Sequence, residues 1–260
     1  MTSSAKALSG KRVLVTRPAH QNAQFAQMLA DAGAQAVLAP TIQLVPPDER
    51  AAAEQAVARA ATYTWVVFTS ANGVRAFFDI MRSRREDARL FGSARIAAIG
   101  IKTAEALLEQ RVYADLVPQT YVAEDLAEAL ITASKPGDAI LIFRAEEARD
   151  VLPVRLRESG READVIAAYK TVFTDDPDFA AKVASCDILT FTSASTVRGF
   201  AHNLHGSAQA ARAANGKVVA CIGPITAGEA RAHGLRVDVI AEAFTVDGLL
   251  AALERAATTA

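Results

Sequence analysis

The stretch Val66–Phe78, VVFTSANGVRAFF, recurs as Leu189–Ala201, LTFTSASTVRGFA, with seven of thirteen positions identical at an offset of 123 residues. The next motif keeps this offset, because Ile96–Ala104, IAAIGIKTA, matches Val219–Ala227, VACIGPITA. A repeat of this size is a domain rather than one turn of a solenoid. The chain therefore contains two similar halves, and its 260 residues are enough for two domains of ordinary size.

Short β-branched runs alternate with helical patterns along both halves. The clearest predicted strands are 65–68, 95–99, 139–143, 164–168, 188–191 and 218–222. Predicted helices begin after Ser70, Lys102, Ser193 and Ile225, and near Ala123 and Val246. We interpret 206–216 as a loop or a solvated helix end. The alternation predicts two parallel α/β sheets covered on both faces, with the two halves facing each other across a cleft.

A second pairing has a different offset. Val13–Arg17, VLVTR, matches Ile140–Arg144, ILIFR, at 127 residues, so the halves differ in length by four residues. The stretch that differs contains Pro40–Pro47, whose extended, proline-bounded pattern is typical of a connector. We therefore predict a discontinuous α/β domain (1–40 and 174–260), an inserted α/β domain (46–167) and two connecting segments (41–45 and 168–173).

Composition excludes several classes of protein. The net charge is −1 and no long Lys/Arg run is present, so nucleic-acid binding is not expected. The longest apolar runs have only the length of a strand, and the N-terminus lacks the pattern of a signal peptide, so we expect a cytoplasmic protein without membrane contact. Cys186 and Cys221 lie at or beside predicted buried strands, and we expect both to be free core thiols.

Four predicted strands end in the same way: a buried run stops at a small or hydroxyl residue and a helix follows at once. These ends are Thr69–Ser70, Gly100–Thr103, Thr192–Ser193 and Gly223–Thr226. Free amides at a helix N-terminus bind carboxylate or phosphate, and such ends lie on the ligand side of open α/β sheets. The alternative is that these hydroxyls only cap their helices. Their repetition in both halves favours ligand binding.

Arginines also occupy equivalent positions in the two halves. Arg17 and Arg144 each follow a predicted strand, and a guanidinium binds carboxylates through two parallel hydrogen bonds. Arg75 and Arg198 lie one turn into equivalent helices, where a solvated helix face is the better interpretation.

Motifs for the familiar cofactors are absent from the sequence. No glycine-rich nucleotide fingerprint follows a strand, and no serine occupies a nucleophile elbow. His202 and His205 lack the neighbouring ligands of a metal site. A catalytic function would therefore depend on shape, hydrogen bonds and electrostatics.

The motifs taken together resemble those of the uroporphyrinogen-III synthase family. They are VTRP at 15–18, FTSANGV at 68–74, IG-x-x-TA in both halves, AYKT at 168–171 and AFTVDGLL at 243–250. The resemblance runs from about Lys11 to Leu253. It implies two flavodoxin-like parallel-sheet domains joined by a two-stranded antiparallel ladder, with the substrate in the cleft between them. Family members close hydroxymethylbilane into uroporphyrinogen III, with loss of water and inversion of ring D, in tetrapyrrole biosynthesis.

The resemblance also implies roles for particular residues. Tyr169 is the expected proton donor to the departing hydroxyl, and the alternative is that its ring only packs against the ladder. The implied substrate-binding residues are Arg17, Thr69, Ser70, Asn72, Gly100, Lys102, Thr103, Arg144, Ser193, Ser195, Gly223, Thr226 and Thr245. No cofactor and no metal are expected.

The expected partners are the tetrapyrrole substrate and, transiently, the preceding enzyme of the pathway, and the expected oligomeric state is a monomer. A non-catalytic two-lobed protein that binds a small ligand or senses a tetrapyrrole is the alternative function.

Overall fold

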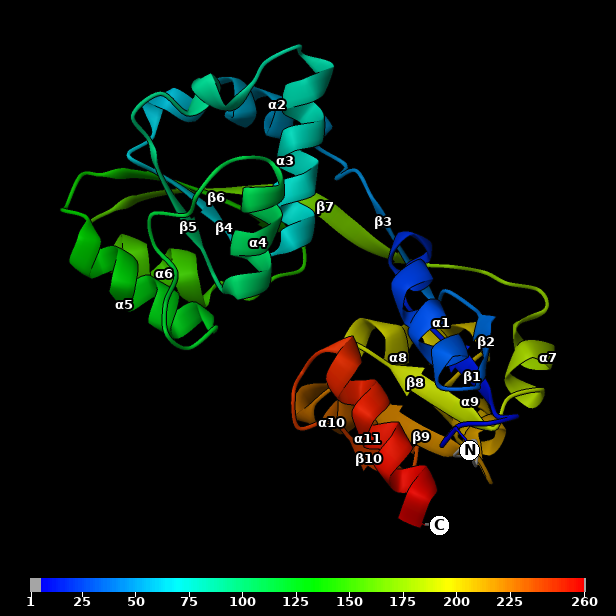
Figure 1. Cartoon of the computed structure of the whole chain (residues 1–260). Coiled ribbons are helices and arrows are strands. Elements are labelled where there is room, and N and C mark those ends of the chain that lie inside the picture. The colour runs from blue at the N-terminus through cyan, green and yellow to red at the C-terminus, as the bar shows by residue number, and fades with distance from the viewer. Residues whose placement is uncertain (1–5, 260) are drawn as a thin grey trace. The chain divides into compact units, whose positions relative to one another are not determined.

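The computed structural model describes residues 6–259, and the chain divides into two compact units (Figure 1). The first unit consists of Met1–Gln43 and Val172–Ala260, and the second is Leu44–Thr171. The first unit is therefore discontinuous in sequence. The two crossings fall inside strands β3 (Ile42–Val45) and β7 (Glu162–Phe173), which are neighbours in one sheet.

The sheet of the first unit has the strand order β10-β9-β8-β1-β2, and its strand pairs are parallel. Its strands are β1 (Arg12–Val15), β2 (Gln35–Leu38), β8 (Ile188–Phe191), β9 (Val218–Cys221) and β10 (Val239–Ile240). Its helices are η1 (Ala19–Gln21), α1 (Asn22–Asp31), α7 (Phe179–Ala184), α8 (Ala194–Asn203), α9 (Ser207–Ala214), α10 (Pro224–Ala232) and α11 (Val246–Thr259).

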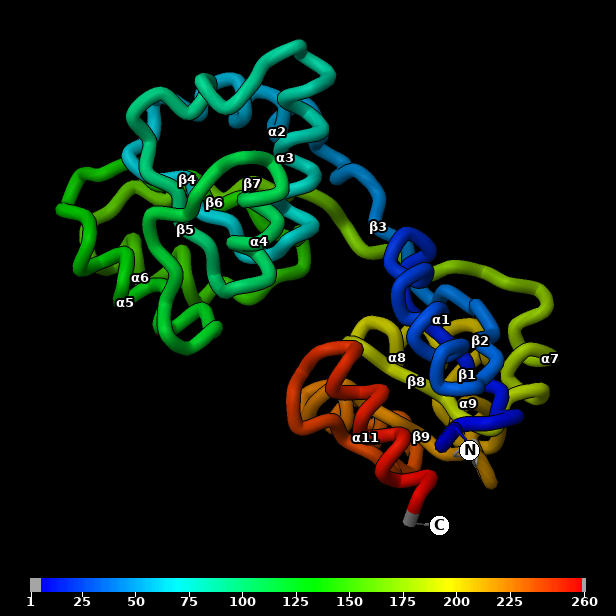
Figure 2. The backbone as a smooth tube through the Cα atoms, viewed as in Figure 1, coloured from blue at the N-terminus to red at the C-terminus, as the bar shows by residue number. Residues whose placement is uncertain are grey.

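The sheet of the second unit has the order β3-β7-β6-β4-β5. Besides β3 and β7, its strands are β4 (Trp65–Phe68), β5 (Arg95–Ala98) and β6 (Ala139–Ala145). Its helices are α2 (Arg50–Ala58), η2 (Ala60–Thr62), α3 (Ala71–Ser83), η3 (Ala88–Phe91), α4 (Ile101–Glu109), α5 (Ala123–Ala133) and α6 (Val151–Glu158). The backbone trace in Figure 2 follows the chain through these elements.

The two sheets repeat one topology. The sequence repeat makes β4 and β5 equivalent to β8 and β9, and β6 equivalent to β1. The order β5-β4-β6-β7 in the second unit then corresponds to β9-β8-β1-β2 in the first. The fold is therefore α/β with two sheets built mainly from parallel pairs, as the alternation of strands and helices predicted.

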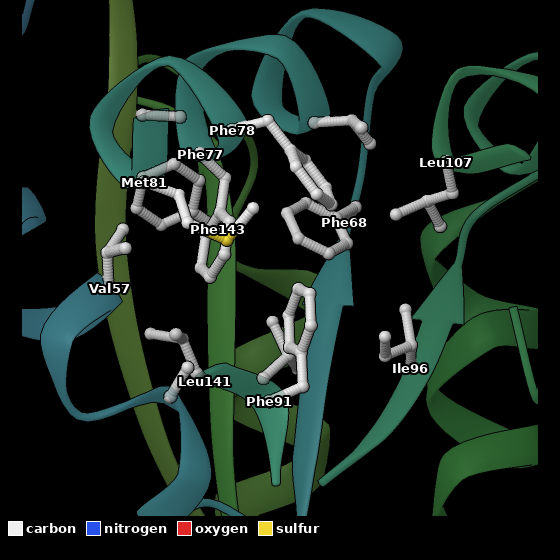
Figure 3. Close-up of a cluster of buried hydrophobic side chains, with 14 of the residues drawn as sticks. Val57, Phe68, Phe77, Phe78, Met81, Phe91, Ile96, Leu107, Leu141 and Phe143 are labelled. Atoms are coloured by element: carbon white, nitrogen blue, oxygen red, sulfur yellow. The ribbon is translucent and has the colours of Figure 1, made fainter. Parts of the chain in front are cut away.

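Strand residues of the second unit alternate between two cores. Phe68 and Phe143 belong to the cluster under α2, α3 and α4, whereas Trp65 and Ile142 belong to the cluster under α5 and α6. Figure 3 shows the first cluster, in which the ring of Phe77 lies 5.3 Å from the rings of Phe68 and Phe143. This alternation is the period of two that a strand buried on both faces requires.

The first unit is built in the same way, with one cluster under α7, α8, α9 and α10 and another under α1 and α11. Cys186 and Cys221 are buried and free, as predicted. Within residues 6–259, no helix is both long and apolar enough to cross a membrane.

Three predictions about helices were wrong. Helix α4 begins at Ile101 and α10 begins at Pro224, each two residues before the predicted start. The extended glycines Gly100 and Gly223 are the N-caps, so the helices follow them directly. The third error is the stretch 206–216, which contains helix α9 because Ala210 and Ala214 are buried on one face of it.

Candidate functional site at the carboxyl ends of the strands

The end of β4 places a serine hydroxyl beside a tyrosine hydroxyl in the second unit. Thr69 and Ser70 follow the strand, and Ser70 is the N-cap of α3, where its Oγ accepts a hydrogen bond of 3.0 Å from the amide of Gly73. The same Oγ lies 3.1 Å from the hydroxyl of Tyr169. Either hydroxyl is able to donate in this contact, because a serine Oγ that accepts one bond keeps a second lone pair as well as its own proton.

Tyr169 lies in β7 opposite Ala145, where the register between β6 and β7 shifts. The tyrosine ring packs against the core cluster that contains Phe68 and Phe143. The ring is therefore a packing group, and the hydroxyl is a polar group that contacts the N-cap of α3. The packing of the ring agrees with the second interpretation of Tyr169, and its role as a proton donor stays a prediction.

The end of β5 leaves a helix N-terminus without a side-chain cap. Gly100 has extended backbone and no side chain to accept from the first amides of α4. Thr103 is the third residue of the helix and is buried, so it does not cap it. Lys102 is exposed and pairs with Glu105 at 2.9 Å. The first-turn amides of α4 therefore present partial positive charge with a cation nearby.

The strand ends of the first unit repeat this contrast. Ser193 caps α8 in a capping box with Thr196, and the Oγ atoms of Ser193 and Ser195 lie 2.9 Å apart. Gly223 caps α10 without a side chain, and Thr226 is buried in the first turn. Each unit therefore has one serine-capped helix and one glycine-capped helix at equivalent strand ends.

Two further predicted residues make local contacts. The Oδ1 of Asn72 accepts a bond of 3.3 Å from Arg75. The Oγ1 of Thr245 accepts a bond of 3.0 Å from the amide of Gly248, one turn into the loop–helix junction of α11. The hydroxyl of Thr245 therefore stabilises the start of that helix.

Arg17 follows the end of β1 and has unused hydrogen-bonding capacity. One of its terminal nitrogens donates to the Oε1 of Gln21 at 3.0 Å, whereas its buried Nε has no partner among residues 6–259. Burial lowers the pKa of the Arg17 guanidinium from its ordinary value. A desolvated guanidinium with an unpaired donor is the chemistry of an anion-binding residue.

The sequence analysis did not name Asn22 as a candidate site residue. It lies at the start of α1, five residues after Arg17, and its side chain is buried. Its Oδ1 has no hydrogen-bond partner in the part of the chain that the structure describes. A single asparagine in a first helical turn is a common feature, so the sequence contained no signal that distinguished it.

Arg144 differs from Arg17 although the two positions are equivalent in sequence. Its side chain is 9% exposed and bonds to the loop that follows β6. One terminal nitrogen donates to the carbonyl of Arg149 at 2.7 Å and the other to Asp150 at 2.5 Å. These contacts hold the loop 145–150, and they use donors that a ligand would need.

The residues described define a class of protein, namely one with two α/β units that repeat the same pattern of capped and uncapped helix N-termini at their strand ends. Residues 23–251 match the family model described as uroporphyrinogen-III synthase HemD. The chain therefore belongs to the uroporphyrinogen-III synthase family, which confirms the resemblance of its motifs. Membership of this family makes it an enzyme of tetrapyrrole synthesis.

Individual relatives agree with this assignment. The chain is 34% identical over 257 residues to the uroporphyrinogen-III synthase of Synechococcus elongatus, covering 95% of this chain and 96% of the relative. It is 31% identical to the porphyrin biosynthesis protein HemD of Ruminiclostridium josui over 94% of this chain. The chain spans about half of that second relative, 48% of its length.

Solved structures share the fold at lower identity. A mutant uroporphyrinogen III synthase from Thermus thermophilus superposes with a TM-score of 0.65 at 17% identity, covering 96% of this chain and all of the other. The uroporphyrinogen-III synthetase of Helicobacter pylori gives a TM-score of 0.63 at 16% identity, covering 96% and 99%.

Proposed function

We propose that this chain closes hydroxymethylbilane into uroporphyrinogen III, with loss of water and inversion of ring D, as a cyclising hydro-lyase. The observation that carries the proposal is the match to the uroporphyrinogen-III synthase family over 23–251. The repeated helix N-termini support it, because a tetrapyrrole precursor with many carboxylates needs several anion-binding groups.

The substrate carboxylates bind at the strand ends of each unit. The uncapped amides that follow Gly100 and Gly223 are the stronger anion sites, because no side chain of the cap competes for them. The hydroxyls of Thr103 and Thr226 lie in the same first turns and supply additional donors there. Arg17 adds a full positive charge in the first unit.

The other predicted binding residues have less direct roles. Ser70, Ser193, Ser195 and Thr69 complete the polar surface around the serine-capped helices. The remaining predicted residues, which mainly position loops or add charge at the rim, are Asn72, Lys102, Arg144 and Thr245.

The chemical step needs one proton donor. The C–O bond of the hydroxymethyl group breaks, the hydroxide takes a proton from Tyr169 and leaves as water, and the pyrrole that carried it becomes an azafulvenium cation. The substituted carbon of ring D attacks this cation to form a spiro intermediate. The older bond from that carbon to its bridge carbon then breaks, the released bridge carbon bonds to the free α-carbon of ring D, and the proton lost from that α-carbon returns to the phenolate. Ser70 orients the phenolic proton of Tyr169. When the Ser70 hydroxyl donates to the tyrosine oxygen, the phenolic proton points away from Ser70 and is free for the substrate.

Selectivity matters more than barrier height, because the substrate also closes spontaneously without inversion. Binding the carboxylates fixes the conformer in which the azafulvene meets the substituted carbon of ring D.

The proposal requires no cofactor or metal, and it includes a cytoplasmic monomer that contacts the preceding enzyme transiently. We also propose two domains, one formed by 1–40 together with 174–260 and the other by 46–167. The segments 41–45 and 168–173 connect them.

The test is an assay in which hydroxymethylbilane is generated freshly and isomers I and III are separated by chromatography. We expect isomer III without added cofactor and with full activity after exhaustive chelation. Isomer I alone, at the uncatalysed rate, would reject the enzyme proposal. A requirement for a metal after chelation would reject the cofactor-free mechanism.

A further inference from the structure

Each glycine-capped helix has an aromatic ring against its cap. A Cβ atom added to Gly100 would lie 2.9 Å from Cγ of Tyr121, and one added to Gly223 would lie 3.1 Å from Cδ1 of Phe244. Both glycines have extended backbone, which any residue adopts. The glycines are therefore needed for the space that the rings occupy and not for a special backbone conformation.

The two rings occupy equivalent positions of the repeat. Tyr121 follows Gly100 by the same number of residues as Phe244 follows Gly223, so the pair keeps the offset of 123. Each ring lies in the segment just before a helix, α5 in one unit and α11 in the other. The identities of the neighbouring residues differ, but an aromatic side chain beside a cap glycine is retained in both units.

The rings lie beside the cap glycines and are not buried. Tyr121 is 53% exposed and Phe244 is 64% exposed. The apolar residues of the same two helix starts, Ile101 and Ile225, are also exposed. Aromatic rings that serve packing alone, such as Phe68 and Phe191, are fully buried here. An exposed aromatic ring beside a helix N-terminus suits a ligand with both an anionic group and an apolar ring.

We propose that Tyr121 and Phe244 are positioning residues that stack on pyrrole rings of the tetrapyrrole, one in each unit. The inference rests on the proposed function and deepens it. A pyrrole with acetate and propionate side chains has an aromatic face and carboxylates a few bonds apart. The helix amides bind the carboxylate, and the adjacent ring contacts the pyrrole face. Carboxylate binding alone does not fix the rotation of a pyrrole about its side chain, whereas stacking does.

The experiment compares variants that remove the ring with variants that keep it. Tyr121→Leu and Phe244→Leu remove the aromatic face, Tyr121→Phe and Phe244→Tyr keep it, and Tyr113→Leu is the control at an exposed tyrosine outside the strand ends. The probe is uroporphyrin III, titrated by its fluorescence. We expect each leucine variant to bind about 3- to 10-fold more weakly, which corresponds to one aromatic contact, and the aromatic exchanges and the control to bind like the parent chain.

A kinetic measurement provides the second readout. The Tyr121→Leu/Phe244→Leu double variant should raise KM and increase the share of isomer I, while its thermal unfolding midpoint stays unchanged. Gly100→Ala should mimic Tyr121→Leu in binding, because the new methyl group displaces the ring. Unchanged affinity and isomer ratio in a folded double variant would overturn the inference.

The two proposals fail in different ways. If the parent chain makes isomer III and the leucine variants match it, only the stacking inference is rejected. If the parent chain makes isomer I alone but binds uroporphyrin III more tightly than the leucine variants do, stacking is supported and the enzyme proposal is rejected.

Discussion

The hydroxyl oxygen of Tyr169 lies 3.1 Å from the Oγ of Ser70, although 99 residues separate them in the sequence. Ser70 caps α3 with the same oxygen. The contact therefore links the proposed proton donor to a helix N-terminus and places a tyrosine hydroxyl among polar groups rather than in the core.

Tyr169→Phe should keep the fold and the affinity for product but lower turnover by about 10- to 100-fold, the lower range for removal of one general acid. Tyr169→Ala should also destabilise the protein, because only this variant removes the ring that packs against the core. Single-turnover kinetics and thermal unfolding separate the two effects. Full activity in a folded Tyr169→Phe variant would assign the proton to another source, such as a substrate carboxylate.

Arg17→Gln should affect ligand binding, whereas Arg144→Gln should affect stability. Arg17 has an unpaired donor, so Arg17→Gln should weaken binding of uroporphyrin III with little change in stability. Arg144 holds the carbonyl of Arg149 and the carboxylate of Asp150, so Arg144→Gln should lower the free energy of unfolding by about 1–3 kcal/mol. Urea unfolding and a binding titration on both variants test the contrast, which equal binding losses would contradict.

Gly199→Ala and Gly228→Ala should change stability in opposite directions, although both are glycines within helices. A Cβ at Gly199 would lie 2.4 Å from the carbonyl oxygen of Thr41, so the alanine forces α8 away from the chain that leaves the first unit. We expect a loss of about 1–3 kcal/mol. Apart from the backbone of its own helix and its chain neighbours, no atom of residues 6–259 lies within 4 Å of a Cβ at Gly228, so that alanine should add about 0.5–1 kcal/mol through helix propensity. Denaturant midpoints measure both changes.

Cys221 should contribute to stability at neutral pH and lose that contribution in alkali. Burial raises the pKa of its thiol from 9.0 to about 12. The folded state therefore retains the proton more strongly than the unfolded state, and the stabilisation is complete below pH 9 and disappears as the pH rises towards 12. Cys221→Ala should lose less stability between pH 8 and pH 11 than the parent chain, as measured by urea unfolding. An equal loss in both would show that the thiol stays ionisable in the folded protein.

Much of the fold was predictable because the signals are local or repeated. The buried runs 65–68 and 188–191 are strands in the structure, and each is followed by a serine that caps a helix. A strand end and a cap depend on residues within a few positions, and the copy at an offset of 123 reports each signal twice.

The glycine-capped helices show where local patterns were insufficient. Thr103 and Thr226 were candidates for caps from their position after a strand, yet both are buried one turn into their helices. The glycines before them are the caps because the rings of Tyr121 and Phe244 fill the space that a side chain would need. Those rings are about twenty residues away in the chain, beyond the range of any capping pattern.

The sequence by itself determined the duplication, the α/β class and the family, because all three depend on the order and spacing of motifs. Only the tertiary structure decided which of two equivalent arginines has an unpaired donor. Arg144 bonds to Asp150 in its own loop, whereas the Nε of Arg17 has no partner in the part of the chain that the structure describes. The contact between Tyr169 and Ser70 likewise depends on the register shift beside β6. Residues at equivalent positions of the repeat follow equivalent strands. The packing around each residue decides which of its hydrogen-bond donors remain available.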